Sequence, residues 1–272
     1  MEYRLNSSEL IDKCSFSWNE LCSNETDKRA FLDRLQAFTG ADPAAAEIID
    51  VSDFGINYSS ESYVPPATDA NKANVVLILG NPAPESVAMG AMFAYENHGK
   101  RYHRFWRVLD GAGILRFPQD PDTLDPHAKM DKLYAGEYDS PFNIFIVPFY
   151  SFPTPPGGEW NGVAGIQRLF GSAFPVIATQ DNERVQALFD AHLKDGDSIL
   201  AFQKDAFIAL SDSQEVPAPY NYKDLLQQPA ISAFRSRSGA SANLICMLPT
   251  RLLHSRQTKG ALSRLALGEA LS

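Results

Sequence analysis

The feature that most constrains the fold is an alternation of short apolar runs with helix-length segments, which begins near residue 74. The run Asn74–Leu79 is almost wholly β-branched or leucine, and it ends at Gly80-Asn81-Pro82. Continuous apolar runs of this length are typical of strands that are covered on both faces, as in parallel sheets. Similar runs predict further strands at Asn143–Phe149, Ala173–Ala178, Ser198–Phe202 and Asn243–Leu248.

Helix-length segments lie between these runs, at His103–Gly111, Asp181–Lys194 and Ser255–Leu267. Strands that alternate with helices predict the α/β class, here a three-layer αβα sandwich around a mostly parallel central sheet. In such sheets, ligands bind beyond the carboxyl ends of the strands. The residues that follow the predicted strands are therefore the candidate site, in particular those after Leu79, Val147 and Met247.

The first 73 residues lack this rhythm, and we expect an N-terminal helical extension and linker before one domain over residues 74–272. Ser17-Trp-Asn-Glu20 has the spacing of a capping box, and Asp27–Phe38 carries aromatic and leucine side chains along one helical face. Asp42-Pro43 supplies a cap and a proline at the first helical position. The stretch Tyr58–Asn74 is rich in Ser, Pro, Asp and Asn, which predicts a linker or surface loop.

Composition excludes several classes of protein. No apolar run approaches the roughly 20 residues of a membrane span, and the first residues, MEYRLNSSELIDK, have no apolar core of the kind that signal peptides carry. The three cysteines, Cys14, Cys22 and Cys246, are too few for a disulfide framework or a four-cysteine metal site. We therefore expect a cytoplasmic protein with reduced thiols, no membrane association and no metal or cofactor; the oligomeric state is left open.

The net charge of −9 is unevenly distributed. The stretch Leu225–Gly268 has six Lys and Arg and no acidic residue, and Asn97–Leu109 has four and again no acidic residue. Two basic islands in an otherwise acidic chain are compatible with a local anion-binding face. They are also compatible with the solvated faces of two helices, and charge alone leaves both interpretations open.

Four short motifs occur in a fixed order and carry a resemblance to a known family. They are Asn81-Pro82 with Gly90 and Phe93-Ala94; Arg104-Phe105-Trp106 with Ala112-Gly113; Phe202-Gln-Lys-Asp-Ala206; and Leu248-Pro249 with Ser255-Arg256. In these motifs the chain resembles the uracil-DNA glycosylase superfamily, most closely its mismatch-specific uracil/thymine branch. The resemblance covers roughly residues 74–268 and leaves the N-terminal segment outside.

The resemblance implies a glycosylase that flips a deaminated base, with uracil as the expected one, out of uracil- or mismatch-containing DNA. It would hydrolyse the N-glycosidic bond with a water positioned by the carbonyl of Asn81, and Phe93 would stack on the base. Backbone groups at Gly80 and Pro82 would bind the base edge, and Gly90 would let the backbone turn close to it. The residue types also allow an Asx-turn at Asn81 and simple core packing of Phe93.

The resemblance assigns DNA contacts to the loop and helix start near the C-terminus. Arg251, Arg256 and Lys259 would contact phosphates, together with Ser255 at the start of the predicted helix. His254 occupies the position of the family's inserted apolar side chain, where an imidazole can stack. Its alternative is a loop residue without a role.

Four departures from the family pattern affect substrate choice more than fold. Ala83 and Gln203 each replace a glycine, Thr250-Arg251-Leu252 replaces a polar-Pro-Ser stretch, and Glu96–Tyr102 is an insertion that carries Lys100. Reading of the opposite base therefore cannot be carried over. Two other functions stay open: a non-catalytic nucleic-acid-binding member of the same fold, and an unrelated α/β enzyme that acts on a small nucleotide or carbohydrate.

Overall fold

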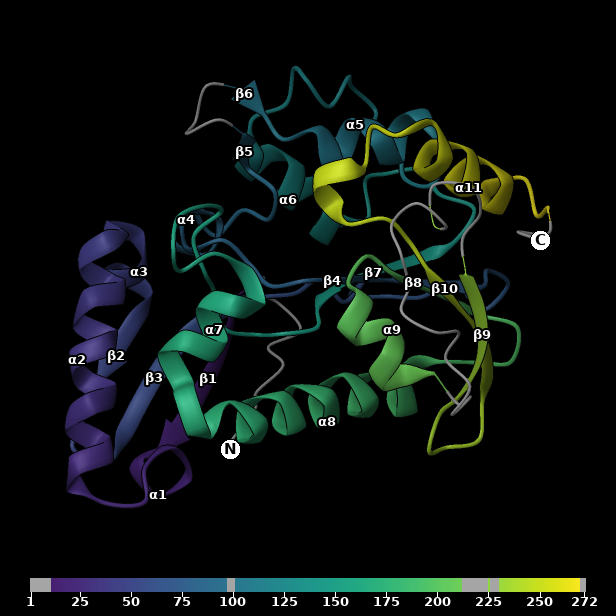
Figure 1. Cartoon of the computed structure of the whole chain (residues 1–272). Helices are drawn as coiled ribbons and strands as arrows, with labels where there is room; N and C mark the ends of the chain where they lie inside the picture. The colour runs from purple at the N-terminus through teal and green to yellow at the C-terminus, as the bar shows by residue number, and fades with distance from the viewer. Residues whose placement is uncertain (1–10, 97–100, 212–224, 226–229, 270–272) are drawn as a thin grey trace. The chain divides into compact units, whose positions relative to one another are not determined.

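The computed structural model describes residues 11–96, 101–211, 225 and 230–269, and the chain divides into two compact units (Figure 1). Each unit is assembled from segments that are far apart in the sequence. The first comprises Met1–Ser62, Gly80–Met92 and Pro148–Val185; the second comprises Tyr63–Leu79, Phe93–Val147 and Gln186–Ser272. The division into residues 1–73 and 74–272 that the sequence suggests is a different one and stays a prediction.

The second unit is built on a five-stranded sheet in the order β7-β4-β8-β10-β9 (Figure 1). The strands β4 (Asn74–Leu79), β8 (Ser198–Ala201) and β10 (Ser241–Cys246) are parallel, and β9 (Ala230–Arg235) runs antiparallel to β10 at one edge. At the other edge, β7 (Asn143–Pro148) lies beside β4. The predicted α/β class with a mostly parallel sheet is confirmed.

The burial of these strands explains why their sequences are continuously apolar. Every residue of β4, β7 and β8 is buried, so neither face of the strand can carry polar side chains without a partner. The predicted strand at Ala173–Ala178 is wrong, because η1 (Gly171–Ala173) and the long helix α8 (Phe174–His192) occupy those residues. A six-residue apolar run fits a buried strand and a helix equally well, and here the helical residues that follow decide.

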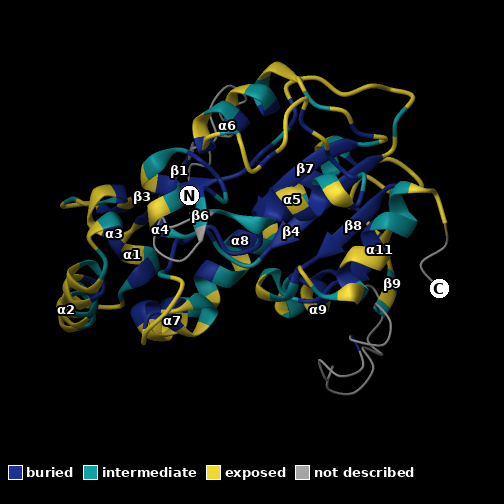
Figure 2. Ribbon diagram, turned by 90° about the horizontal axis from the view of Figure 1, so that it is seen from above, coloured by how far each residue is buried: buried dark blue, intermediate teal, exposed yellow. Residues whose placement is uncertain are grey.

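Helices lie on both sides of this sheet. Figure 1 shows α5 (Arg104–Gly111) and α11 (Arg256–Ala266) on one side, and α9 (Lys204–Leu210) with the C-terminal part of α8 on the other. Figure 2 shows the buried strands beneath α5 and α11 and the exposed outer faces of these two helices. The predicted helices at 103–111 and 255–267 are confirmed, and that at 181–194 forms part of α8. The second unit also contains α6 (Pro126–Ala135).

The first unit contains a three-stranded antiparallel sheet in the order β1-β3-β2. Its strands are β1 (Ile11–Ser17), β2 (Ile49–Val51) and β3 (Gly55–Glu61). The prediction of a purely helical extension is therefore wrong for these residues, and so is the predicted loop over Tyr58–Glu61. The sequence of β3, GINYSSE, is as polar as a loop although most of its residues are buried.

The helices predicted near the N-terminus are confirmed. The Ser17 amide and hydroxyl both donate to the Glu20 carboxylate at 2.8 Å, which closes the capping box of α1 (Trp18–Leu21). Asp42 caps α3 (Pro43–Ile48) by accepting from the Ala44 amide at 3.0 Å. Between them, α2 (Glu25–Ala41) buries the side chains that its sequence places on one face, which are Phe31, Leu35 and Phe38. The unit also contains α4 (Pro84–Met89) and α7 (Gly162–Phe170).

No helix within the described residues is both long enough and apolar enough to cross a membrane.

Candidate functional site

Asn81 lies in the turn between β4 and α4, within the first unit. Two backbone hydrogen bonds tie this turn to the segment that follows β7. The Tyr150 amide donates to the Gly80 carbonyl at 3.0 Å, and the Thr154 amide donates to the Pro82 carbonyl at 3.0 Å. The turn that carries Asn81 is therefore fixed on both sides of that residue.

The orientation of the Asn81 amide is set by its nitrogen. Nδ2 donates to the Thr154 hydroxyl at 2.7 Å and to the Pro82 carbonyl at 3.1 Å. A carbonyl oxygen only accepts, so the nitrogen and not the oxygen must face Pro82. No described residue donates a hydrogen bond to Oδ1, and its neighbour Gly162 has no side chain; even a Cβ built there would stand 4.0 Å from Oδ1. Oδ1 is therefore available to accept a hydrogen bond from a water.

This geometry bears on the Asx-turn that the sequence also allows at Asn81. In an Asx-turn, the side-chain oxygen accepts a backbone N–H two residues further on. Among the described residues, Asn81 uses its nitrogen instead, and α4 has no side-chain cap at Ala83. The strand end is thus held by backbone bonds, and the Asn81 oxygen is not used to cap it.

A buried ion pair supports the segment that holds Asn81. The Arg184 guanidinium contacts the Asp181 carboxylate at 3.3 Å, and both side chains are almost fully buried. Arg184 also donates to the carbonyls of Pro148 and Phe149, and Asp181 accepts from the Ser151 amide at 3.0 Å. Burial raises the pKa of Asp181 even though Arg184 opposes the shift. The segment is therefore anchored in the interior, and Thr154 at its end is itself buried.

Gly90 ends α4 in a left-handed conformation, with φ of 68°. Its amide donates to the Val87 carbonyl at 3.0 Å, as in a helix C-cap. The glycine is explained by this backbone conformation, which a side chain would strain. Its predicted part in binding a base stays a prediction.

Phe93 belongs to the second unit and has a strained backbone. Among the described residues it is the one non-glycine residue with positive φ, at 50°. Its ring stacks on Phe105 with centroids 4.0 Å apart and planes 17° apart, and the Trp106 indole nitrogen donates to its carbonyl at 3.3 Å. Strain of this kind costs roughly 1–3 kcal/mol and persists where the surroundings impose it, often at ligand sites. Phe93 is half-buried, so part of it packs as core and part remains accessible.

The predicted DNA-contacting residues gather around the start of α11. Arg251 lies in η2 (Thr250–Leu252), and Arg256 and Lys259 lie in the first turns of the helix; all three are exposed. Ser255 caps α11: its hydroxyl accepts from the Thr258 amide at 3.1 Å and donates to the Thr258 hydroxyl at 2.9 Å. The Ser255 hydroxyl is thus used by the helix itself.

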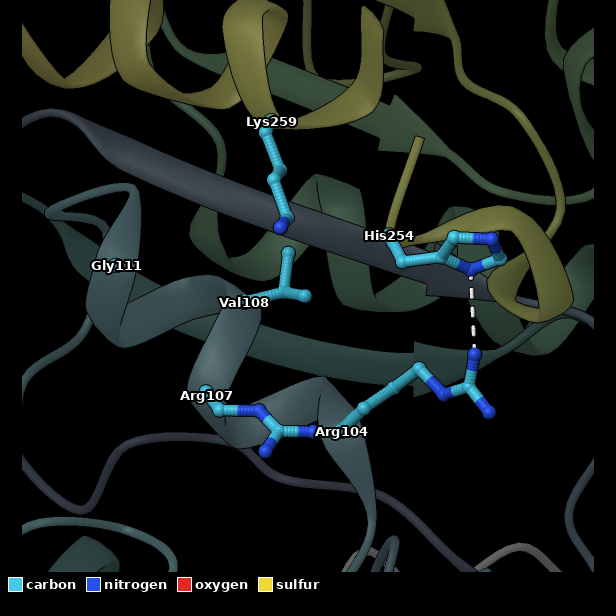
Figure 3. Close-up of a pocket in the computed structure, with 6 residues that line it drawn as sticks. All are labelled: Arg104, Arg107, Val108, Gly111, His254 and Lys259. Atoms are coloured by element: carbon cyan, nitrogen blue, oxygen red, sulfur yellow. Dashed lines mark hydrogen bonds between the residues drawn. The ribbon is translucent and has the colours of Figure 1, made fainter. Parts of the chain in front are cut away.

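The structure brings the two basic islands of the sequence together in one groove of about 440 Å³ (Figure 3). Four of its lining residues come from α5 and two from the C-terminal segment: Arg104, Arg107, Val108, Gly111, His254 and Lys259. The His254 Nδ1 atom lies 3.2 Å from the Arg104 guanidinium. Because a guanidinium only donates, Nδ1 is the acceptor in this contact. His254, for which a loop without a role was the alternative, therefore lines a basic groove.

Two short strands of the second unit include the described ends of the insertion at Glu96–Tyr102. They are β5 (Tyr95–Glu96) and β6 (Arg101–Tyr102), which pair antiparallel. Lys100, which the insertion carries, lies outside the described residues.

Two further features of the described residues bear on chemistry, the absence of a metal-ligand cluster and the burial of two cysteines. No group of three or more His, Cys, Asp or Glu side chains is arranged to hold a metal ion in the described part of the chain. Burial raises the pKa of the Cys14 and Cys246 thiols to about 12, so neither is a thiolate at neutral pH.

Sequence reasoning missed four residues that the structure adds to the predicted ones. In the first unit, Tyr150 and Thr154 hold the turn that contains Gly80, Asn81 and Pro82. They follow the predicted strand at 143–149. The sequence therefore placed them at a strand end where a ligand was expected, although it did not single them out. In the second unit, Arg104 and Arg107 line the same groove as His254 and Lys259. The sequence feature that pointed to the two arginines was the acid-free stretch in which they lie.

Comparison with known proteins adds no family to this picture. No protein-family model matches the chain, and no curated protein matches it significantly. The class that the structure itself defines is α/β, with a mostly parallel five-stranded sheet in the second unit.

Proposed function

We propose that the protein is a DNA glycosylase that hydrolyses the N-glycosidic bond of a deaminated base, with uracil as the expected substrate. The proposal includes the finer fold assignment, a three-layer sandwich of the uracil-DNA glycosylase type. One observation carries it: the Asn81 amide is held through its nitrogen, and no described residue occupies its oxygen. The ordered motifs of the sequence support it.

In the proposed reaction, Asn81 positions the attacking water and does not act as a strong base. Its Oδ1 accepts a hydrogen bond from the water, which directs the water oxygen at the anomeric carbon of the sugar. The bond between that carbon and the base nitrogen breaks, and the base leaves with the electron pair through an oxocarbenium-like transition state. The water's oxygen stays on the sugar with one hydrogen, its other proton passes to solvent, and the base departs as its anion, which leaves an abasic site.

Phe93 is the residue proposed to stack on the extruded base. The Phe105 ring and the Trp106 hydrogen bond fix the position of Phe93 before any ligand binds. A ring that is already ordered loses little entropy when a base stacks on it. The positive φ of Phe93 is a further cost that a purely structural aromatic residue would not require.

The exposed cations around the start of α11 are proposed to contact phosphates. Arg251 lies in η2 just before α11, and Arg256 and Lys259 lie in the first turns of that helix, whose amide groups also favour anions. Contacts of this kind make DNA affinity fall as salt increases.

The experiment that tests the proposal is a panel of oligonucleotides that carry uracil, hypoxanthine or a thymine mismatch. After incubation with the protein, alkali cleaves at any abasic site and the fragment is measured. We expect cleavage at uracil in the wild-type reaction, and none in an identical oligonucleotide that carries cytosine.

A second candidate function is a nucleic-acid-binding protein without catalysis. The basic groove favours this function, because a cationic groove can bind nucleic acid without catalysing any reaction. A pure binder would shift the mobility of the uracil oligonucleotide and leave no abasic product. An α/β enzyme that acts on a small nucleotide would show no salt-dependent DNA affinity.

A further inference from the structure

The groove between α5 and α11 has cationic side chains on both of its walls. Figure 3 shows Lys259 extending from α11 toward Val108, while Arg104 and Arg107 extend from the α5 wall. Arg104 and Arg107 are three positions apart on one helix, which places them on the same face. Val108 is buried at the floor, and Gly111 leaves the end of the groove without a side chain.

The lining residues carry three positive charges and no negative one. Arg107 forms an ion pair with the Asp122 carboxylate at 2.8 Å. Both side chains of that pair are well exposed, at 52% and 41%, and exposed ion pairs contribute little free energy. A phosphate can therefore replace Asp122 at Arg107 at small cost.

We infer that this groove binds the phosphate backbone of one nucleic-acid strand. The inference builds on the proposed function, because it takes DNA as the ligand and extends its path from α11 to Arg104 and Arg107. These two arginines are outside the set that the motifs assign to DNA.

The size and the lining of the groove favour a strand over a small anion or a stacked base. Its volume of about 440 Å³ is many times that of a water, roughly 30 Å³, and it has room for more than one phosphate group. Its cations are spread along one wall and face a cation on the other, an arrangement that suits consecutive phosphates. His254 is the one aromatic ring among its six lining side chains, and no Phe, Tyr or Trp is present on which successive bases could stack. Binding in the groove is therefore independent of sequence.

The test measures binding of an undamaged, fluorescein-labelled single-stranded oligonucleotide by anisotropy, over a series of salt concentrations. The variants are Arg107→Gln and Lys259→Gln. Each removes one phosphate contact, so we expect affinity to fall about three- to tenfold and the slope of log K against log salt to become shallower by about 0.7.

A matched control separates the groove from net charge. Arg168 is also an exposed arginine in an ion pair, with Glu159, but it lies in α7 of the first unit. Arg168→Gln changes the net charge by the same amount as Arg107→Gln, and we expect it to leave both the affinity and the salt slope near the wild-type values.

Gly111 offers a second, independent pair of variants. Apart from its own helix backbone, no atom lies within 4 Å of the position that a Cβ would take there, so a Cβ meets open space. Gly111→Glu places a carboxylate in the groove, and Gly111→Gln places a neutral side chain of the same size. We expect Gly111→Glu to weaken binding at least about tenfold more than Gly111→Gln, because only the charge repels phosphate.

Several results would overturn the inference. Arg107→Gln and Lys259→Gln could bind like Arg168→Gln with an unchanged salt slope, or Gly111→Glu could bind like Gly111→Gln. Displacement of the oligonucleotide by inorganic tripolyphosphate at equal total phosphate would also overturn it, since the groove would then be a site for small anions.

These outcomes are distinct from failure of the proposed reaction. Undamaged oligonucleotide binds without excision, so a protein that binds through the groove and leaves uracil in place would contradict the glycosylase alone. A protein that excises uracil while the groove variants bind normally would contradict the groove alone.

Discussion

At the scale of single residues, Thr154 is the side chain that fixes the Asn81 amide. Its hydroxyl accepts from Nδ2 at 2.7 Å. Thr154→Val keeps the shape and removes this acceptor, so we expect kcat for uracil excision to fall about tenfold, the equivalent of one hydrogen bond, with KM unchanged. Thr154→Ser restores the acceptor and should restore kcat. Steady-state kinetics give kcat and KM for both variants, and a Ser variant as slow as the Val variant would contradict this positioning role.

The burial of Glu61 predicts how the stability of the protein changes with pH. It is 6% exposed, and burial, with Asp12 as a smaller cause, raises its pKa from 4.5 to about 8. Between these values the folded protein holds a proton that the unfolded chain releases. The contribution of Glu61 to the free energy of unfolding is therefore greatest below pH 4.5. It falls as the pH rises toward 8, by at most about 1.4 kcal/mol per pH unit.

Glu61→Gln tests this, since an amide cannot release the proton. Urea unfolding of the wild type and the variant, measured between pH 5 and 8.5, should show the wild type losing stability relative to Glu61→Gln as the pH rises. Parallel curves over this range would show that Glu61 does not titrate as its burial implies.

At the scale of elements, the sheet of the first unit depends on Gly55. Antiparallel pairing of β1 with β3 places Gly55 opposite Ser17, and a Cβ at Gly55 would lie 1.9 Å from the Phe16 carbonyl oxygen. Backbone atoms cannot give way as a flexible side chain can. We expect Gly55→Ala to lower the free energy of unfolding by about 3 kcal/mol, the upper part of the range for overpacking.

Gly40 provides the control for that substitution. It lies in α2, and nothing is within 4 Å of its Cβ position. Gly40→Ala should raise stability by about 0.5–1 kcal/mol through helix propensity. If the urea midpoints of both variants shifted in the same direction from the wild-type midpoint, the result would contradict the pairing of β1 with β3.

The elements that the sequence predicted well share one physical property, which is that local pattern and burial agree. β4 and β7 are continuously apolar and buried on both faces, and α2 has its apolar side chains at helical spacing. The sequence did not predict β3, because its pattern and its burial disagree. Its Ser and Glu residues are buried by partners that are distant in sequence. The start of α8 was predicted as a strand, because a short apolar run fits a buried strand and a buried helix equally well.

At the scale of the whole molecule, each unit joins segments that the sequence separates, and this limits what could be predicted of the site. The turn at Asn81 and its neighbours was found from its motif. Thr154 lies 73 residues further on, and only the fold shows that its hydroxyl meets the Asn81 amide. The groove likewise joins Arg104 to His254, 150 residues apart. Charge counting found both islands but could not show that they share one groove.

The central claim is that the Asn81 oxygen positions the water that releases uracil. The most direct measurement is the single-turnover rate of uracil excision by the wild type and by Asn81→Ala, with affinity for the same oligonucleotide measured in parallel. The account predicts abasic product with the wild type, and a rate at least about 100-fold lower with Asn81→Ala at similar affinity. Excision by Asn81→Ala at the wild-type rate, or no excision by either protein, would contradict it.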